Sequence, residues 1–512
     1  MTALRTLAAG FLLAASIISL DAQVPAGRPA APKTRTQRYL EIVSGNEVLS
    51  NAAWGILAVT MKGDTVAAWN PGMRMIPASN MKLITTGAAL HALGADFKYE
   101  TRICCDGPVE DGVLKGDLYI VGGGDPTTAS ADSVAVPRMK LWEQWKGFLD
   151  KAGIKKIAGR VIGDGRYFDG PIENDTWESQ DLGTDYGTGG DGLCFYRNVQ
   201  EVKVSAGASP GDEVNVSPSF PDTPWMVYKL SCRTGPKGTG DNLYLFNSDV
   251  FPYAEIRGTF AVDRKPKTEY FSNKFGAYTC ASYFCNYLRT HGIPVEGGVA
   301  DVRMGRIRSE LTNLSYGRYA AKVDGMQVLG RTYSPPLWKI ARETNHRSDN
   351  FYAETMLRTL GRRGRHSACY DSSRVAVREV LAGLGAPADE VRIEDGSGLS
   401  RKNYISPSYL VGFLRAMMDS PAFEEYAGSL PQPGTGTLAS RLKDQPEDVK
   451  GRFHMKSGSM NGVLCYSGYL EPRKGSRDET IVFSLMTNNV IAPTRDLTPI
   501  IDMILSSLAS EN

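Results

Sequence analysis

Ser79-Asn80-Met81-Lys82 is the stretch from which the architecture of this chain can be worked out. It lies inside the run 75–90, where Pro77 and Ser79 mark a helix start and apolar residues recur at helical spacing. Residues three positions apart share one face of a helix, so we expect the Lys82 amine to lie beside the Ser79 hydroxyl. A serine becomes a nucleophile when a base takes its proton, and a lysine serves as that base once burial or nearby cations lower its pKa. The alternative is an ordinary helix cap formed by Ser79.

Two further clusters lie much later in the chain. Ser348-Asp349-Asn350 precedes an apolar helical run at 351–357, which predicts a turn at a helix start, or simply a set of capping residues. Lys456-Ser457-Gly458-Ser459 lies in an extended stretch. A glycine in a strand lets a ligand backbone come close, and the neighbouring Lys, Ser and backbone N–H groups suit an anionic substrate. Without a ligand, Gly458 would mark a bulge in the strand.

In this order, the three clusters match the motif set of class A β-lactamases and penicillin-binding proteins. Lys82 and Ser348 are 266 positions apart, which leaves room for one or two domains that a compact β-lactamase lacks. From about residue 37 to its C-terminus, the chain resembles the low-molecular-mass class C penicillin-binding proteins, the D-alanyl-D-alanine carboxypeptidase/endopeptidase family. Other stretches that fit the family are 118–126, Asp395-Gly396-Ser397-Gly398-Leu399-Ser400-Arg401, 433–438 and 461–463.

The resemblance implies a serine acyl-transfer mechanism at these positions. Ser79 would attack the carbonyl carbon between two D-alanines, and Lys82 would accept its proton. Ser348 and Lys456 would pass a proton to the departing amine, and Asn350 would orient both the peptide and Lys82.

The third cluster would supply the oxyanion hole and the carboxylate site. By resemblance, the backbone N–H groups of Ser79 and Ser459 would bind the oxyanion, while Ser457 and Ser459, on either side of Gly458, would hold the terminal carboxylate. The family usually has threonine at the position of Ser457 and commonly at that of Ser459. Both serines keep a hydroxyl, so we expect the function to be retained.

The family also recognises the free end of the stem peptide, with an acidic residue from the insertion, an arginine and a hydrophobic residue near the third motif. By motif position, these residues would be Asp181, Arg401 and Met460. The alternative for Asp181, which lies in the loosely matching stretch 177–182, is a solvent-exposed loop carboxylate.

The predicted fold is α+β, with a β-lactamase/transpeptidase-like domain built on a five-stranded antiparallel sheet flanked by helices. A helix is expected near 38–44, followed by strands near 54–61 and 65–70, and three more strands and a last helix are expected near 453–459, 463–471, 479–486 and 496–508. The catalytic domain is thus predicted to be discontinuous, at 37–100 and 310–512. Residues 101–309 are predicted to form inserted, mainly β accessory domains, two in number, with one nested near 166–260.

Composition excludes several function classes. The chain has 512 residues, and its hydrophobic content of 42% is that of a globular protein with a sizeable core. A net charge of +2, from 58 basic and 56 acidic residues, does not indicate the excess of basic residues that is typical of nucleic-acid-binding proteins. The five histidines lack metal-binding spacing and the glycines at 122–124 lack nucleotide-binding spacing, so we predict no metal and no cofactor. The eight cysteines permit disulfides without requiring them.

The N-terminal residues predict export. Arg5 and the apolar stretch 7–20 are typical of a signal peptide, cut after Ala22 and followed by a flexible lead-in at 23–36. That stretch is shorter than the roughly 20 residues that span a bilayer, so no transmembrane anchor is predicted and the protein is assigned to the periplasm.

Together these features predict an exported serine-type D-Ala-D-Ala carboxypeptidase/endopeptidase. It would hydrolyse peptidoglycan stem peptides or cross-links, and β-lactams would acylate Ser79. One alternative is a β-lactamase or esterase on the same fold, in which deacylation is fast. Another is a cell-wall-binding protein without catalytic activity.

Overall fold

A five-stranded antiparallel sheet joins the two ends of the chain. The computed structural model describes residues 33–302 and 325–511. The strands in spatial order are β17 (Phe453–Met460), β18 (Val463–Leu470), β19 (Ile481–Asn488), β1 (Ala53–Thr60) and β2 (Thr65–Trp69). Every residue of β18 and β19 is buried, because helices cover both faces of the sheet.

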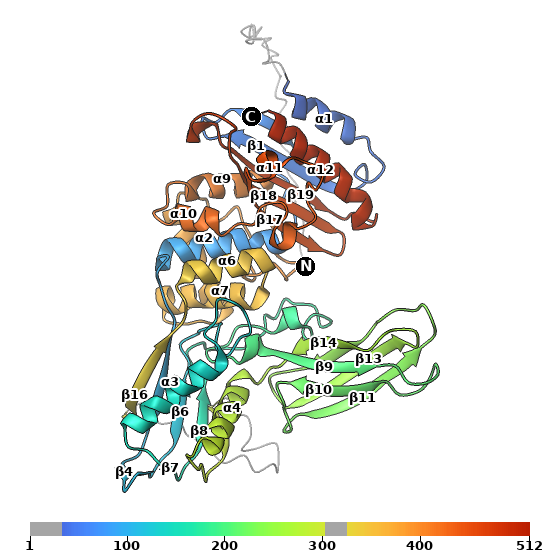
Figure 1. Cartoon of the computed structure of the whole chain (residues 1–512). Helices are drawn as coiled ribbons and strands as arrows, with labels where there is room; N and C mark the ends of the chain where they lie inside the picture. The colour runs from blue at the N-terminus through green and yellow to red at the C-terminus, as the bar shows by residue number, and fades with distance from the viewer. Residues whose placement is uncertain (1–32, 303–324, 512) are drawn as a thin grey trace, which may run out of the picture.

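Helices from both termini cover one face of this sheet. α1 (Arg35–Val43) and α12 (Thr494–Ser510) lie side by side there, and their apolar residues share a core with β1, β18 and β19 (Figure 1). α9 (Pro407–Met417) packs on the other face, followed by α2 (Met81–Leu93). The remaining helices of this half are α6 (Leu337–Arg347), α7 (Asn350–Arg365), α8 (Tyr370–Gly383), α10 (Phe423–Gly428) and α11 (Glu447–Lys450).

The insertion supplies most of a second five-stranded sheet, which lies at the opposite end of the molecule and also includes a strand from residues 327–333 (Figure 1). Its strands in spatial order are β15 (Val299–Asp301), β8 (Val161–Asp164), β6 (Leu118–Val121), β3 (Glu100–Cys105) and β16 (Gln327–Tyr333). α3 (Arg138–Lys151) and α4 (Gly276–Thr290) pack against it around Trp142, Trp145 and Phe284. Three two-residue strands, β4 (Val109–Glu110), β5 (Val113–Leu114) and β7 (Lys156–Ile157), form a small sheet of their own.

Two three-stranded sheets complete the insertion and share one small apolar core. The first consists of β10 (Asn215–Phe220), β9 (Val199–Ser205) and β14 (Lys267–Ser272). The second consists of β11 (Val227–Gly235), β13 (Tyr253–Ala261) and β12 (Tyr244–Asn247). Short 3₁₀ turns lie at Ala78–Asn80, Asp185–Gly187, Tyr196–Asn198, Gly436–Leu438 and Arg477–Glu479.

The predicted fold class is confirmed, with local differences. The last strand is displaced by two residues from its predicted range 479–486, and α1 begins inside the predicted lead-in. The helices α3 and α4 were not predicted, since their stretch was assigned to a mainly β region. The predicted signal peptide at 1–22 and the predicted domain boundary at 309–310 lie outside the described residues. The other domain bounds stay predictions.

Three properties of the described residues bear on function. None of their helices combines the length and apolar character that a membrane crossing requires. They contain no cluster of His, Cys, Asp and Glu side chains that could hold a metal ion. All eight cysteines fall within this part of the chain, and all are free thiols.

Arg358 of α7 joins the catalytic half to the insertion. This guanidinium is fully buried and donates to four backbone carbonyls, namely Asp169 (2.5 Å), Pro171 (3.0 Å), Gly190 (2.6 Å) and Ala368 (2.9 Å). Three of these carbonyls belong to the insertion. A buried polar group without a hydrogen-bond partner is costly, so the carbonyls depend on this side chain.

Replacing Arg358 with methionine should therefore destabilise the whole molecule. We expect Arg358→Met to lower the free energy of unfolding by about 3 kcal/mol or more, because it removes the donor to four carbonyls, two of them on the buried residues Gly190 and Ala368. Equilibrium denaturation in urea measures the change. Arg378→Met, on the exposed side of α8, is the matched control, and an equal loss in both variants would contradict this assignment.

Candidate active site

Ser79 lies in a 3₁₀ turn that leads directly into α2. The turn spans Ala78–Asn80 and begins with a left-handed residue, Ala78 (φ 46°), a conformation that costs energy for any residue with a Cβ. Neighbouring elements hold it in place. Asn80 donates from its side chain to the Ser467 hydroxyl on β18 (2.8 Å), and Gly458 of β17 packs against the same turn. Ser79 therefore faces the end of β17 from a fixed backbone position.

Lys82 reaches back from α2 to Ser79, as the spacing predicts. Its Nζ atom lies 3.1 Å from Ser79 Oγ, 2.6 Å from Asn350 Oδ1 and 2.7 Å from the Ser397 carbonyl oxygen. The side chain is 0% exposed. Burial lowers the pKa of Lys82 to about 8, although the charges of Asp395, Glu354 and Asp349 oppose this shift.

These contacts suit a neutral amine. Such an amine has two hydrogens and one lone pair. In this neutral form, the two carbonyl-type oxygens, which can only accept, would take both hydrogens, and the lone pair would face the Ser79 hydroxyl; in the charged form, Nζ would donate to all three oxygens. Asn350 is fixed in this orientation because its Nδ2 donates to the Tyr186 carbonyl (3.0 Å).

A second buried lysine lies on the other side of the site. Lys456 is 0% exposed and donates to Ser348 Oγ (3.0 Å) and to the Ser457 carbonyl (2.7 Å). Burial, and then the charge of Lys82, hold its pKa well below the usual lysine value. Ser348 ends α6 in a left-handed conformation (φ 59°), one residue before Asp349, which caps the start of α7.

A charge cluster that the sequence did not predict holds the second motif. Asp349 caps α7 by accepting from Tyr352 N (2.9 Å), and its other oxygen accepts from Arg197 of the insertion (2.5 Å). Asp132 contacts Arg197 and also accepts from Tyr352 Oη (2.7 Å) and Arg347. Burial disfavours the charge on Asp132, but Arg197 and these other partners hold its pKa below the usual value.

The motifs surround a cavity of about 440 Å³. Seven of the eleven predicted site residues line it: Ser79, Ser348, Asn350, Ser459, Asp181, Arg401 and Met460. Lys82 and Lys456 are buried and contact Ser79 and Ser348 in its wall. Gly458 packs on the Ser79 turn. Ser457 is absent from the described wall and donates instead to Thr437 Oγ1 (2.9 Å).

One end of the cavity carries charged residues from the insertion and from the third motif region. Arg401 donates to Met460 Sδ (3.3 Å) and to the Asn461 carbonyl (3.2 Å), and it lies 4.0 Å from Glu178. Burial, together with the charge of Glu178, raises the pKa of Asp181. The sequence had singled out Asp181, whereas Glu178, three positions earlier, was missed although it is a second carboxylate in the same stretch.

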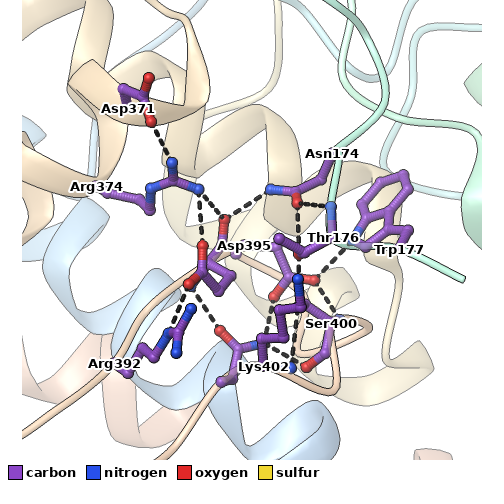
Figure 2. Close-up of polar contacts among 12 residues, drawn as sticks. Asn174, Thr176, Trp177, Asp371, Arg374, Arg392, Asp395, Ser400 and Lys402 are labelled. Atoms are coloured by element: carbon purple, nitrogen blue, oxygen red, sulfur yellow. Dashed lines mark hydrogen bonds and ion pairs between the residues drawn. The ribbon is translucent and has the colours of Figure 1, made fainter.

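Residues 394–400 form a loop with many hydrogen bonds, and the insertion contacts it directly (Figure 2). Figure 2 shows Asn174, Thr176 and Trp177 reaching from the insertion to this loop. Trp177 Nε1 donates to Asp395 Oδ2 (2.8 Å), and Asn174 Nδ2 donates to the Glu394 carbonyl (2.7 Å). On the other side, Glu394 pairs with the arginines Arg374 and Arg392.

A model of the D-Ala-D-Ala carboxypeptidase 3 (S13) family matches residues 37–508. The chain belongs to this family. It is a serine-type D-Ala-D-Ala carboxypeptidase of the low-molecular-mass class C penicillin-binding proteins, as the motifs predicted.

Similar proteins span most of the chain. A D-alanyl-D-alanine carboxypeptidase of Actinomadura sp. (strain R39) is 27% identical over 474 residues, which cover 90% of this chain and 82% of that protein. The D-alanyl-D-alanine carboxypeptidase DacB of Haemophilus influenzae is 24% identical, with 82% of each chain covered.

Solved structures share the fold. Penicillin binding protein 4 of Haemophilus influenzae superposes with a TM-score of 0.74 at 23% identity, covering 90% of this chain and 96% of that one. Its complex with a novel β-lactam has a TM-score of 0.71 at 21% identity, covering 93% of this chain and 99% of that one.

The close packing of Gly458 gives a direct test of the site in this carboxypeptidase. A Cβ at this position would lie 2.6 Å from the Pro77 carbonyl oxygen and 3.0 Å from Ser79 N, so Gly458→Ala must push β17 away from the Ser79 turn. We expect kcat/KM for D-alanine release from a pentapeptide to fall at least about tenfold. Gly412→Ala, with open space around its Cβ, is the control. Unchanged kinetics in Gly458→Ala would contradict a rigid contact.

Proposed function

We propose that this carboxypeptidase is exported to the periplasm and hydrolyses peptidoglycan stem peptides and cross-links through an acyl-enzyme on Ser79. One observation carries the proposal: at the wall of a cavity, Ser79 Oγ lies 3.1 Å from a fully buried lysine amine whose pKa is about 8. Such an amine can take a proton near neutral pH, which an exposed lysine cannot.

The Ser79 hydroxyl and the Lys82 amine both take part in the acylation step. Ser79 Oγ attacks the carbonyl carbon between the two D-alanines while its proton passes to Lys82 Nζ. The oxyanion that forms would accept hydrogen bonds from the backbone N–H groups of Ser79 and Ser459. The packing of Gly458 on the Ser79 turn supports this role, because it brings the end of β17 next to Ser79 N.

Breaking the peptide bond requires a proton on the departing D-alanine amine. Ser348 would donate that proton and recover one from Lys456, whose Nζ lies 3.0 Å from Ser348 Oγ. Water then attacks the ester carbonyl carbon. Its proton would pass through Ser348 to Lys456, and Lys82 would return its proton to Ser79 Oγ as the ester bond breaks. The terminal carboxylate of the substrate would bind Ser459, and Ser457 would join it by turning its hydroxyl away from Thr437.

Two properties follow from this chemistry. A β-lactam presents a strained amide to the same serine, so it would form an ester that water releases slowly, and the β-lactam complex of the Haemophilus protein supports this expectation. Export is proposed from the apolar stretch 7–20. It would bring the enzyme to the peptidoglycan.

The labelling of Ser79 by a fluorescent penicillin should depend on pH. Burial lowers the pKa of Lys82, so the amine is neutral above about pH 8, whereas an ordinary lysine stays charged to higher pH. We expect the acylation rate to rise about tenfold per pH unit below this midpoint and to fall again at higher pH, where Lys456 loses the proton that it would pass on through Ser348. Gel fluorescence of reactions stopped at successive times gives the acylation rate, and mass analysis of the labelled protein locates the label.

Two outcomes would count against the proposal. A label that persists in Ser79→Ala would mean that another group is the nucleophile. Rapid release of hydrolysed penicillin from the wild-type protein would favour a β-lactamase or esterase instead. Digestion of purified peptidoglycan, with mass analysis of its products, separates D-alanine release from the cutting of cross-links.

The charged end of the cavity is proposed to bind the free end of the stem peptide through Asp181, Arg401 and Met460. A charge-assisted hydrogen bond contributes about 1.5–3 kcal/mol, so we expect Asp181→Asn to lower kcat/KM at least about tenfold for stem peptides that carry a free amine. Acylation by a penicillin without an amine should stay unchanged in the same variant. Equal losses on both substrates would mean that Asp181 acts only on the structure.

A further inference from the structure

A buried carboxylate on α7 lies directly behind the proposed base. Glu354 is 0% exposed and stands one helical turn after Asn350, so the two side chains share one face of α7. Asn350 contacts Lys82 directly. Glu354 contacts the loop whose carbonyl binds Lys82, and it accepts from Ser397 N (2.7 Å) and from Gly396 N at both oxygens (3.1 and 3.2 Å).

Asp395 holds the next peptide unit of the same loop. Its Oδ1 accepts from Gly398 N (2.9 Å). In a trans peptide, the N–H and C=O bonds point in opposite directions, so fixing Gly398 N–H directs the Ser397 carbonyl away from Asp395. That carbonyl points to Lys82 Nζ, at 2.7 Å.

The opposite side of the loop faces α2. The Gly396 carbonyl accepts from Thr85 Oγ1 (2.7 Å), and the Ser397 carbonyl accepts from Lys82, three positions earlier on the same helix. The loop is therefore held by two carboxylates on its N–H side and by α2 on its carbonyl side. Trp177 of the insertion fixes Asp395 in turn, through Oδ2 (2.8 Å).

We propose that Glu354 and Asp395 are positioning residues for the reaction: they hold the N–H groups of residues 396–398 so that the Ser397 carbonyl takes one hydrogen of Lys82 and leaves the lone pair of that amine facing Ser79. This inference rests on the proposed role of Lys82 as the base. The two carboxylates touch neither substrate nor Ser79 and act through the loop.

The pair also sets the charge around the base. Both carboxylates raise the pKa of Lys82 against the effect of burial, and burial together with Asp395 raises the pKa of Glu354 to about 7. Tyr370 of α8 also faces Glu354, and the Arg358 guanidinium lies over the Tyr370 ring, 5.4 Å from its centroid. Asp349 and Lys456 are the other charged groups near Lys82.

Two variants of Glu354 separate geometry from charge. Glu354→Asp keeps the charge but withdraws the carboxylate by one methylene, so the loop loses its anchor, and we expect the maximal rate of acylation by fluorescent penicillin to fall at least about tenfold. Glu354→Gln keeps an acceptor oxygen but removes the charge. We expect its maximal rate to stay within about threefold and its pH midpoint to move down by about half a unit or more, because removing a negative charge near Lys82 makes the protonated amine less stable and lowers its pKa.

Glu379→Gln, an exposed carboxylate on α8, is the matched control and should change neither quantity. Rates are measured per folded molecule, with near-ultraviolet circular dichroism as the check. Asp395→Asn supplies a second test if Glu354→Asp does not fold, because its NH₂ group would oppose N–H donors and should also lower the maximal rate.

The outcomes are decisive in either direction. The proposal would be overturned if the Glu354 variants had the same rates and pH midpoints as Glu379→Gln. It would also be overturned if they had lower melting temperatures but unchanged acylation kinetics, or if Glu354→Gln did not fold. Failure of the proposed mechanism itself looks different, because the wild-type protein would then take no label at Ser79.

Discussion

Burial of the Lys82 amine is the constraint on which the rest of this structure depends. A charged ammonium in a protein interior is costly, and the side chain is 0% exposed. The cost falls when the amine gives up its proton, and the oxygens at 2.6, 2.7 and 3.1 Å can bond the neutral as well as the charged form. Each contact comes from a different element, so α7 and the loop at 396–398 must both meet the start of α2. The assembly of the fold and the activation of the proposed base are thus one requirement.

The insertion takes part in meeting this requirement. It supplies the Tyr186 carbonyl that orients the Asn350 amide, Arg197 that binds Asp349, and Trp177 that binds Asp395. These three contacts reach the start of α7 and the loop that begins at Asp395, both of which lie next to Lys82. An accessory region that only bound the cell wall would need none of them. We infer that the catalytic half and the insertion form one functional unit, in which loosening the insertion also loosens the base.

The sequence predicted what is local and missed what tertiary contacts create. The contact of Ser79 with Lys82 follows from helical spacing, and both halves of the central sheet were recognised from strands and turns near the chain ends. The last strand was misplaced by two residues because all of β19 is buried, so no alternation of polar and apolar residues marks its ends.

The helix α3 was within reach of the sequence, because its buried residues Leu141, Trp142, Trp145 and Leu149 recur at helical spacing. The ion pair of Arg197 with Asp349 could not be predicted from the sequence, because it joins residues 152 positions apart. Similarly, nothing in the apolar run after Asn350 indicates that Glu354 would meet the amides of a loop more than 40 positions away.

The two buried lysines restrict how many protons the site can hold. Each lies in a medium that disfavours charge, and the positive charge of Lys82 lowers the pKa of Lys456 further, so the two cations oppose each other. In the proposed mechanism, this repulsion favours proton transfer from Lys456 toward the departing amine. When Ser79 gives its proton to Lys82, the new charge makes a proton on Lys456 less stable, and Lys456 passes it more readily to Ser348 and on to the departing amine.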